Sequence, residues 1–309
     1  MTTWAEDRAP VEALLRRVRV LELRVNRLLD AGLAGTYRSV FRGRGLEAEG
    51  VREYTYGDDA AVIDWLVSAR ANRTHVRVFR EERELRCLLL VDVSASMRCR
   101  PQGFDPASTA ADLAALLALA AGRNRDRVGL LLFSDAVEDW LPPSRSPQQA
   151  LRLIRAIVGA DPRGEGTDLA LALTTATRLE SQRGLVILIS DMQTPVPEPE
   201  VARLLRRQDL LVLHLVGPAE PEWPVAPVLW VEDAESQRVL ALRPSREAQR
   251  DWQEATRQQA RAARAAVCRY GGDWVDIPCG TAALTTLAAF LSTRARGSRR
   301  AGGRREGAR

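Results

Sequence analysis

The chain has 309 residues, of which 46% are hydrophobic, enough for one large domain or two smaller ones. Its net charge of +5 comes from segment 294–309, which carries seven arginines and one glutamate, so the rest of the chain is close to neutral. This argues against a basic binding face on the folded part. No uncharged apolar run reaches the roughly 18 residues of a membrane helix, and the N-terminus does not have the pattern of a secretory signal. We therefore expect a cytoplasmic protein that does not enter a membrane.

The first predicted element is an amphipathic helix over residues 11–29, within an N-terminal segment of residues 1–34. Apolar residues recur there at intervals of three and four, which places them on one face of a helix. These positions are Val11, Leu14, Leu15, Val18, Leu21, Val25, Leu28 and Leu29. Such a stripe is typical of a helix that packs on its own domain, although a docking helix would have the same pattern.

Residues 35–84 predict a small β-rich module. Glycines separate three short runs with strand character, and Trp65 lies between the second and the third run, where we expect it to be a core residue. The expected strands are Tyr37–Phe41, Val51–Tyr56 and His75–Phe79.

From Leu85 onward, continuous apolar strands alternate with amphipathic helices. This alternation predicts an α/β domain over residues 85–293, with a mostly parallel, doubly wound sheet covered by helices on both faces. A hairpin insert is expected near residues 228–243, and the Arg- and Gly-rich tail 294–309 is expected to be disordered. The expected strands are Cys87–Val91, Arg127–Phe133, Leu185–Ile189, Leu210–Val216 and Trp274–Ile277, and the expected helices are Ala107–Ala121, Pro147–Val158, Leu169–Leu179, Glu198–Arg206, Arg246–Cys268 and Thr281–Thr293.

Polar side chains follow two of these strands and precede one helix. Asp92, Ser94 and Ser96 come directly after the first apolar strand, Thr167 lies in a glycine-containing loop before a helix, and Asp191 follows the strand that ends at Ile189. Ligands of open α/β sheets bind at the carboxyl ends of the strands. Carboxylate and hydroxyl oxygens are hard ligands of the kind that Mg²⁺ takes. The sequence therefore predicts a metal site formed by these five residues.

The pattern Asp-x-Ser-x-Ser, followed by Thr and then by Asp, resembles the metal-ion-dependent adhesion site (MIDAS) of von Willebrand factor type A domains. The resemblance implies a fold of that type and a bound Mg²⁺ or Mn²⁺. In that family the Ser and Thr hydroxyls contact the ion, while the Asp residues act mostly through water. One coordination position stays open, and the resemblance implies that an acidic residue of a protein partner completes it.

The segment before this domain resembles the bacterial domain-of-unknown-function-58 family. The resemblance covers about residues 35–291, but Val62 and Leu66 stand where that family often has basic residues, and the two upstream membrane helices of many members are absent. It implies a non-catalytic interaction protein, an adaptor that works with a MoxR-type AAA+ ATPase in the assembly or maturation of protein complexes. The matching runs are Arg42–Glu47, Arg52–Asp59, Ile63-Asp64-Trp65 and Ser68-Ala69-Arg70.

Two other functions use features of the same sequence. A magnesium-dependent hydrolase acting on a phosphoester would use the ion to polarise its substrate or to activate water, with Glu165 or Asp168 as a candidate base. However, neither a Walker loop nor a Gly-x-Ser-x-Gly elbow is present. Nucleic-acid binding through the arginine tail is the second alternative, but no aromatic residues alternate with the arginines. We therefore predict neither catalysis nor nucleic-acid binding.

Overall fold

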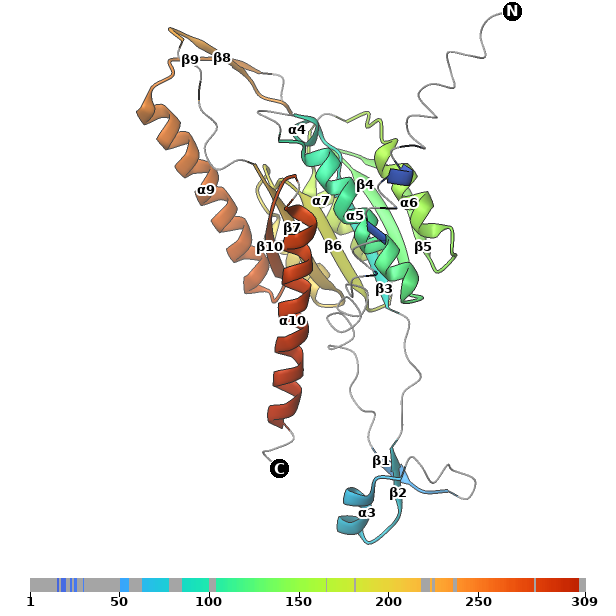
Figure 1. Ribbon diagram of the computed structural model, residues 1–309. Helices are drawn as coiled ribbons and strands as arrows, with labels where there is room; N and C mark the ends of the chain where they lie inside the picture. The colour runs from blue at the N-terminus through green and yellow to red at the C-terminus, as the bar shows by residue number, and fades with distance from the viewer. Residues whose placement is uncertain are drawn as a thin grey trace, which may run out of the picture.

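A computed structural model of the chain shows a six-stranded sheet at the centre of the molecule (Figure 1). Side chains are described up to Arg294, except that of Val51. The structure describes residues 16, 18–20, 23, 25–26, 30, 51–55, 63–77, 85–99, 104–164, 166–180, 182–217, 223, 226–235, 238–280 and 282–305.

The first strand of this sheet lies at its centre. The spatial order is β10-β7-β6-β3-β4-β5, so the chain builds one half of the sheet from β3 outward and then returns to build the other half from β6. All neighbouring pairs are parallel except β4 and β5, and this confirms the predicted doubly wound sheet. The strands are β3 (Arg86–Asp92), β4 (Arg127–Phe133), β5 (Val137–Ser144), β6 (Leu185–Ser190), β7 (Asp209–Val216) and β10 (Asp273–Pro278).

Strand β5 was not expected from the sequence. It contains Pro142 and Pro143, which lack the backbone donor that a central strand needs. At the edge of the sheet these prolines are tolerated, and the pairing with β4 is irregular at two points. The edge position therefore explains why the sequence pattern did not reveal this strand.

Helices cover both faces of the sheet. Alternate residues of each strand point to opposite faces, so Leu89 and Val91 of β3 join one apolar cluster while Leu88 and Leu90 join the other. The first cluster contains residues of α5 (Pro106–Arg123), α6 (Gln149–Val158) and α10 (Ala283–Arg305), and the second contains residues of α7 (Leu169–Leu179), α8 (Glu198–Leu205) and α9 (Arg246–Arg269).

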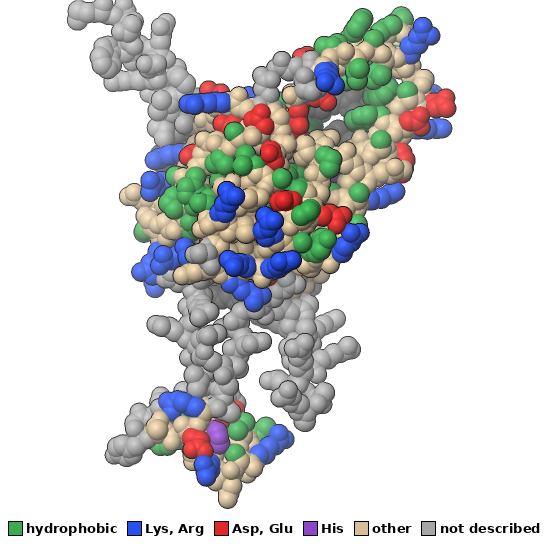
Figure 2. All heavy atoms as spheres, turned by 180° about the vertical axis from the view of Figure 1, so that it is seen from behind, with side chains coloured by type: hydrophobic (Ala, Val, Ile, Leu, Met, Phe, Trp, Pro, Cys, Tyr) green, Lys and Arg blue, Asp and Glu red, His purple; other side chains and the backbone are tan. Residues whose placement is uncertain are grey.

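The predicted hairpin insert is present as two antiparallel strands, β8 (Leu229–Glu232) and β9 (Val239–Leu242). It extends from the start of α9 toward the short helix α4 (Ala95–Arg98), which follows β3 (Figure 1). Six of its eight strand residues are exposed, including Trp230 and Leu240. In the space-filling view the hairpin projects from the body at the upper right and carries hydrophobic side chains (Figure 2).

The N-terminal module pairs β1 (Val51–Glu53) with β2 (His75–Arg77) in antiparallel fashion. Between them lies an unexpected helix, α3 (Trp65–Ala71), which Asp64 caps by accepting hydrogen bonds from two backbone N–H groups. Trp65 is 72% exposed, so the expectation of a core residue was wrong. The cap places Trp65 at the first helical position, where its side chain faces solvent. The expected strand Tyr37–Phe41 lies outside the described residues.

The sequence predicted a packed helix near the N-terminus and a disordered tail at the C-terminus, and the structure agrees with only the first. At the N-terminus, Val18 and Val25 are buried in the first apolar cluster, as the predicted stripe requires. At the C-terminus, α10 continues to Arg305, which corrects the expectation of disorder from residue 294 onward. Alanine and arginine favour a helix, and they outweigh the intervening glycines. Arg294 also pairs with Asp273 at 2.7 Å.

Among the described residues, no helix combines the length and the hydropathy needed to span a membrane.

Candidate metal centre

The predicted site lies where two central strands end. Asp92 is the last residue of β3, and Asp191 directly follows Ser190, the last residue of β6. The two strands are parallel neighbours, so their carboxyl ends meet at one edge of the sheet. This is also the point at which the strand order reverses direction, the usual place for a ligand in an open α/β sheet.

Asp92 is 1% exposed, and neutral donors hold both of its oxygens. Oδ1 accepts a hydrogen bond from the backbone N–H of Ser94 at 2.9 Å, and Oδ2 accepts one from the hydroxyl of Ser190 at 2.7 Å. Burial raises the pKa of Asp92, and these hydrogen bonds offset the rise only in part. The carboxyl group is therefore held in one orientation, but its hydrogen bonds do not fully offset the cost of burying its negative charge.

Ser94 and Ser96 connect Asp92 to Asp191. Their hydroxyl oxygens lie 3.1 Å apart, and Ser96 also forms a hydrogen bond with Asp191. Burial, followed by the charge of Asp92, raises the pKa of Asp191 to about 7. The structure thus brings four of the five predicted residues into one hydrogen-bonded cluster.

The chain turns sharply after Asp191. Met192 adopts a left-handed conformation with φ 54°, which is uncommon for a residue other than glycine. Its N–H donates to the Ser190 hydroxyl at 3.0 Å, and the N–H of Gln193 donates to Asp191 at 3.3 Å. Ser190 therefore supports both the strand end and Asp92.

Thr167, the fifth predicted residue, lies in the loop before α7. The N–H of Asp168 donates to the Ser134 carbonyl at 2.8 Å, and Glu138 accepts from the N–H of Gly164 at 2.9 Å, so the loop is held against the end of β4. A side chain at residue 164 would place its Cβ 1.9 Å from a carboxyl oxygen of Asp135, which explains the glycine.

The Thr167 hydroxyl donates to Glu235 in the turn of the β8–β9 hairpin at 2.6 Å. The charge of Glu235 also contributes to raising the pKa of Asp92 and of Asp191. Glu235 therefore lies within electrostatic reach of both carboxylates while it contacts Thr167. Two residues of this region were not predicted from the sequence. Glu235 could have been suspected only from its place in a polar turn, and Ser190 only as a polar residue at the end of a buried strand.

The donor set fits a hard divalent cation. The predicted residues offer two carboxylates and three hydroxyls. The hydrogen bonds that hold the two carboxylates come from hydroxyls and backbone N–H groups, which carry no formal charge. Within the described residues, no group of three His, Cys, Asp or Glu side chains is arranged to hold a metal alone. Any ion here would therefore depend on the hydroxyls, as Mg²⁺ and Mn²⁺ do more readily than zinc.

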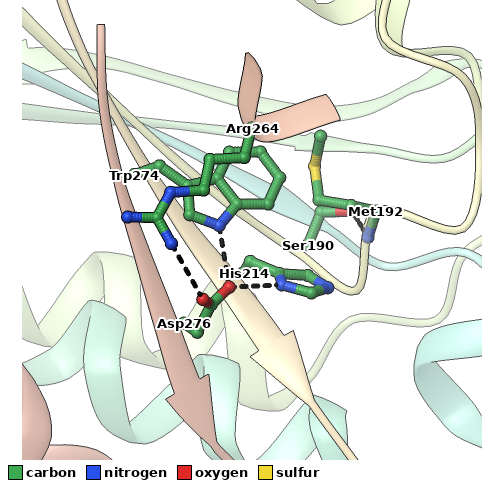
Figure 3. Close-up of polar contacts among 6 residues, drawn as sticks. All are labelled: Ser190, Met192, His214, Arg264, Trp274 and Asp276. Atoms are coloured by element: carbon green, nitrogen blue, oxygen red, sulfur yellow. Dashed lines mark hydrogen bonds and ion pairs between the residues drawn. The ribbon is translucent and has the colours of Figure 1, made fainter. Parts of the chain in front are cut away.

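A second polar cluster lies beside this site, on β7 and β10 (Figure 3). Asp276 contacts Nδ1 of His214 at 2.8 Å, accepts from the indole N–H of Trp274 at 2.7 Å and lies 3.7 Å from Arg264. Burial raises the pKa of Asp276, but the hydrogen bonds from His214 and Trp274 outweigh burial, so the pKa is lowered. His214 is opposite Ser190 in the sheet register. His214 is 9% exposed and is therefore a buried residue of the sheet.

The mostly parallel sheet and its strand order are consistent with the von Willebrand factor A-like fold that the sequence predicted. The sequence matches the family described as "Protein of unknown function DUF58" over residues 50–263. The chain belongs to this family, as the resemblance in the sequence indicated.

The chain is also similar to two mycobacterial proteins over most of its length. "Uncharacterized protein Rv1480" of Mycobacterium tuberculosis (strain ATCC 25618 / H37Rv) is 31% identical over 226 residues, which cover 72% of this chain and 71% of that protein. "Uncharacterized protein Mb1516" of Mycobacterium bovis (strain ATCC BAA-935 / AF2122/97) matches with the same figures.

Solved structures with a similar arrangement include BatB from Bacteroides thetaiotaomicron, at 18% identity and a TM-score of 0.44, over 69% of this chain and 99% of that one. The SpRpn10 VWA domain matches at 11% identity and a TM-score of 0.36, over 68% of this chain and 93% of that one.

Proposed function

We propose that this protein is a non-catalytic, metal-dependent protein-interaction module. In this proposal Asp92, Ser94, Ser96, Thr167 and Asp191 hold one Mg²⁺ or Mn²⁺, and an acidic residue of a partner protein completes the coordination. The observation that carries the proposal is the hydrogen-bonded cluster of Asp92, Ser94, Ser96 and Asp191 at the carboxyl edge of the sheet.

The roles of the residues follow from their chemistry. Asp92 and Asp191 provide the negative charge, and their burial makes that charge costly without a cation. Ser94, Ser96 and Thr167 offer neutral oxygens, which leave part of the charge of a divalent ion uncompensated. The ion supplies an electrophilic centre for a carboxylate of the partner. Water can fill the same position, but a carboxylate also neutralises charge, and this difference would provide selectivity for acidic partners.

Two observations support a function without catalysis. Asp168, a candidate base, caps α7 by accepting from the N–H of Leu171 at 2.8 Å, so its carboxylate has a structural role. His214 is engaged by Asp276 rather than available as a proton acceptor at the metal site. Glu165, the other candidate base, lies outside the described residues.

For the partner, we propose a MoxR-type AAA+ ATPase, with the protein acting as an adaptor in the assembly or maturation of other complexes. The basis is the family resemblance of the sequence. The test is an interaction measurement between the full chain and a purified, surface-immobilised MoxR-type ATPase from the same genome, carried out in Mg²⁺ and again in EDTA.

The expected result is binding in Mg²⁺ that weakens by at least about tenfold in EDTA and in a Ser96→Ala variant. Ser292→Ala is the matched control, because its hydroxyl donates to a backbone carbonyl within α10, away from the site. Equal binding in Mg²⁺ and in EDTA, unaffected by Ser96→Ala, would contradict the proposal. Metal-dependent hydrolysis of a phosphoester, lost in the same variant, would instead favour an enzyme.

A further inference from the structure

The turn of the β8–β9 hairpin brings a third carboxylate to the candidate metal centre. Glu235 accepts a hydrogen bond from the Thr167 hydroxyl at 2.6 Å, although the two residues are 68 positions apart in sequence. A hydroxyl that donates its hydrogen to a carboxylate keeps its lone pairs free. The contact therefore leaves Thr167 able to bind a cation while Glu235 lies beside it.

The position of Glu235 is set by the turn itself. The N–H of Glu235 donates to the Asp233 side chain at 3.0 Å, and the N–H of Asp233 donates to the Arg238 carbonyl at 2.9 Å. The turn is thus closed by its own hydrogen bonds and presents Glu235 in a defined direction. The hairpin runs from the start of α9 toward α4, the short helix that contains Ser96 (Figure 1).

The electrostatic influence of Glu235 agrees with its contact with Thr167. The charge of Glu235 acts on both Asp92 and Asp191, which belong to different strands. Carboxylates that act on one another in this way repel, and a cation near them reduces the repulsion. A carboxylate held 2.6 Å from the hydroxyl of a proposed metal ligand is close enough to bind the same ion as that hydroxyl.

We propose that Glu235 is an internal carboxylate ligand of the metal centre, and that it occupies the position where the acidic residue of a partner would bind. The inference rests on the proposed function, because it needs a divalent cation held by Asp92, Ser94, Ser96, Thr167 and Asp191. It adds a regulatory consequence. The hairpin must release Glu235 before a partner's carboxylate can reach the ion.

The structure of the hairpin suits such a release. Six of its eight strand residues are exposed, so only a small apolar area needs to be separated when the turn moves. A ligand attached to the same chain has a high effective concentration and excludes weak external carboxylates. If the closed form is about tenfold more populated than the open one, the apparent affinity for a partner falls by about the same factor.

The test uses Mn²⁺ as the probe, with the full chain in its wild-type form and as Glu235→Gln. Mn²⁺ affinity is measured by calorimetry, and the water bound to Mn²⁺ by proton relaxation. Glu232→Gln is the matched control, since Glu232 is exposed in strand β8 of the same hairpin. We expect Glu235→Gln to weaken Mn²⁺ binding by about tenfold or more and to add one exchangeable water, with no change in Glu232→Gln.

A second measurement examines competition with an external carboxylate. Acetate added to the Mn²⁺ complex of Glu235→Gln should displace the added water and lower the relaxation rate, whereas the wild-type complex should respond far less. Unchanged Mn²⁺ affinity and water content in Glu235→Gln, with Mn²⁺ binding still lost in Asp92→Asn, would overturn the role of Glu235 while leaving the metal site intact. If the wild type binds no Mn²⁺, the proposed function fails and this inference fails with it.

Discussion

Ser190 and Asp92, at the ends of neighbouring strands, are joined by a 2.7 Å hydrogen bond from the serine hydroxyl to the buried carboxylate. The same hydroxyl accepts the N–H of Met192, so one side chain fixes both the orientation of Asp92 and the turn after Asp191. Ser190 is fully buried, and its hydroxyl is engaged by Asp92 and by the Met192 N–H. We regard it as a positioning residue rather than a ligand.

Replacing Ser190 with Ala should therefore destabilise the fold even without metal. The change leaves one oxygen of buried Asp92 and the N–H of Met192 without their partner, at a cost of about 1–3 kcal/mol in the free energy of unfolding. Urea unfolding in EDTA measures this cost. Thr177→Ala, which removes a hydroxyl bonded to a carbonyl within α7, is the control and should cost less. Similar values for the two variants would argue against the positioning role.

Divalent metal should stabilise the protein by mass action. A ligand that binds only the folded state adds about 2.7 kcal/mol at a concentration of 100 times its Kd, so the melting temperature should rise with Mg²⁺ or Mn²⁺. Asp92→Asn keeps the size of the side chain but removes its charge, and it should abolish the rise. Thermal unfolding followed by circular dichroism measures both. An equal rise in the two proteins would show that the ion binds elsewhere.

The pair of Asp276 and His214 should contribute stability that depends on pH. Because the pKa of Asp276 is lowered in the folded state, its contribution is fully present above its unfolded pKa of about 4 and is lost as the pH falls through the folded pKa. The difference in unfolding free energy between wild type and Asp276→Asn should thus be constant above about pH 5 and shrink as the pH falls through about 4 and below. A difference that does not shrink at low pH would contradict the assignment.

Arg294 should stabilise the protein although it begins the basic tail. Its side chain is 16% exposed and pairs with Asp273 at 2.7 Å, whereas Arg261 is 72% exposed and pairs with Glu254 at 3.5 Å. We expect Arg294→Ala to cost about 1–3 kcal/mol and Arg261→Ala to cost less than about 1 kcal/mol in urea unfolding. Equal effects would mean that the tail does not pack on the sheet.

The sequence was sufficient for the sheet and for most of the site because both depend on local patterns. Continuous apolar runs identified five of the six strands, and Asp92 and Asp191 could be placed because each lies within two residues of the end of such a run. The missed strand, β5, contains two prolines that only an edge position accommodates. The helix that begins at Trp65 could not be predicted from a periodic pattern of apolar residues, because its start depends on capping by Asp64.

Other features depend on contacts between distant segments. No local pattern relates Glu235 to Thr167, because the hairpin that joins them is an insert whose direction is set by the fold. The pairing of Ser190 with Asp92 likewise requires β3 and β6 to be neighbours. The helical tail reflects a competition between helix-forming alanine and arginine and helix-weakening glycine, which composition alone did not resolve.

The most direct measurement of the central claim is anomalous diffraction from crystals of the full chain grown or soaked with Mn²⁺. We predict a single anomalous peak enclosed by Asp92, Ser94, Ser96, Thr167 and Asp191, which is absent from crystals of Asp92→Asn treated in the same way. A peak at another place with none at this cluster, or an identical peak in the variant, would contradict this prediction.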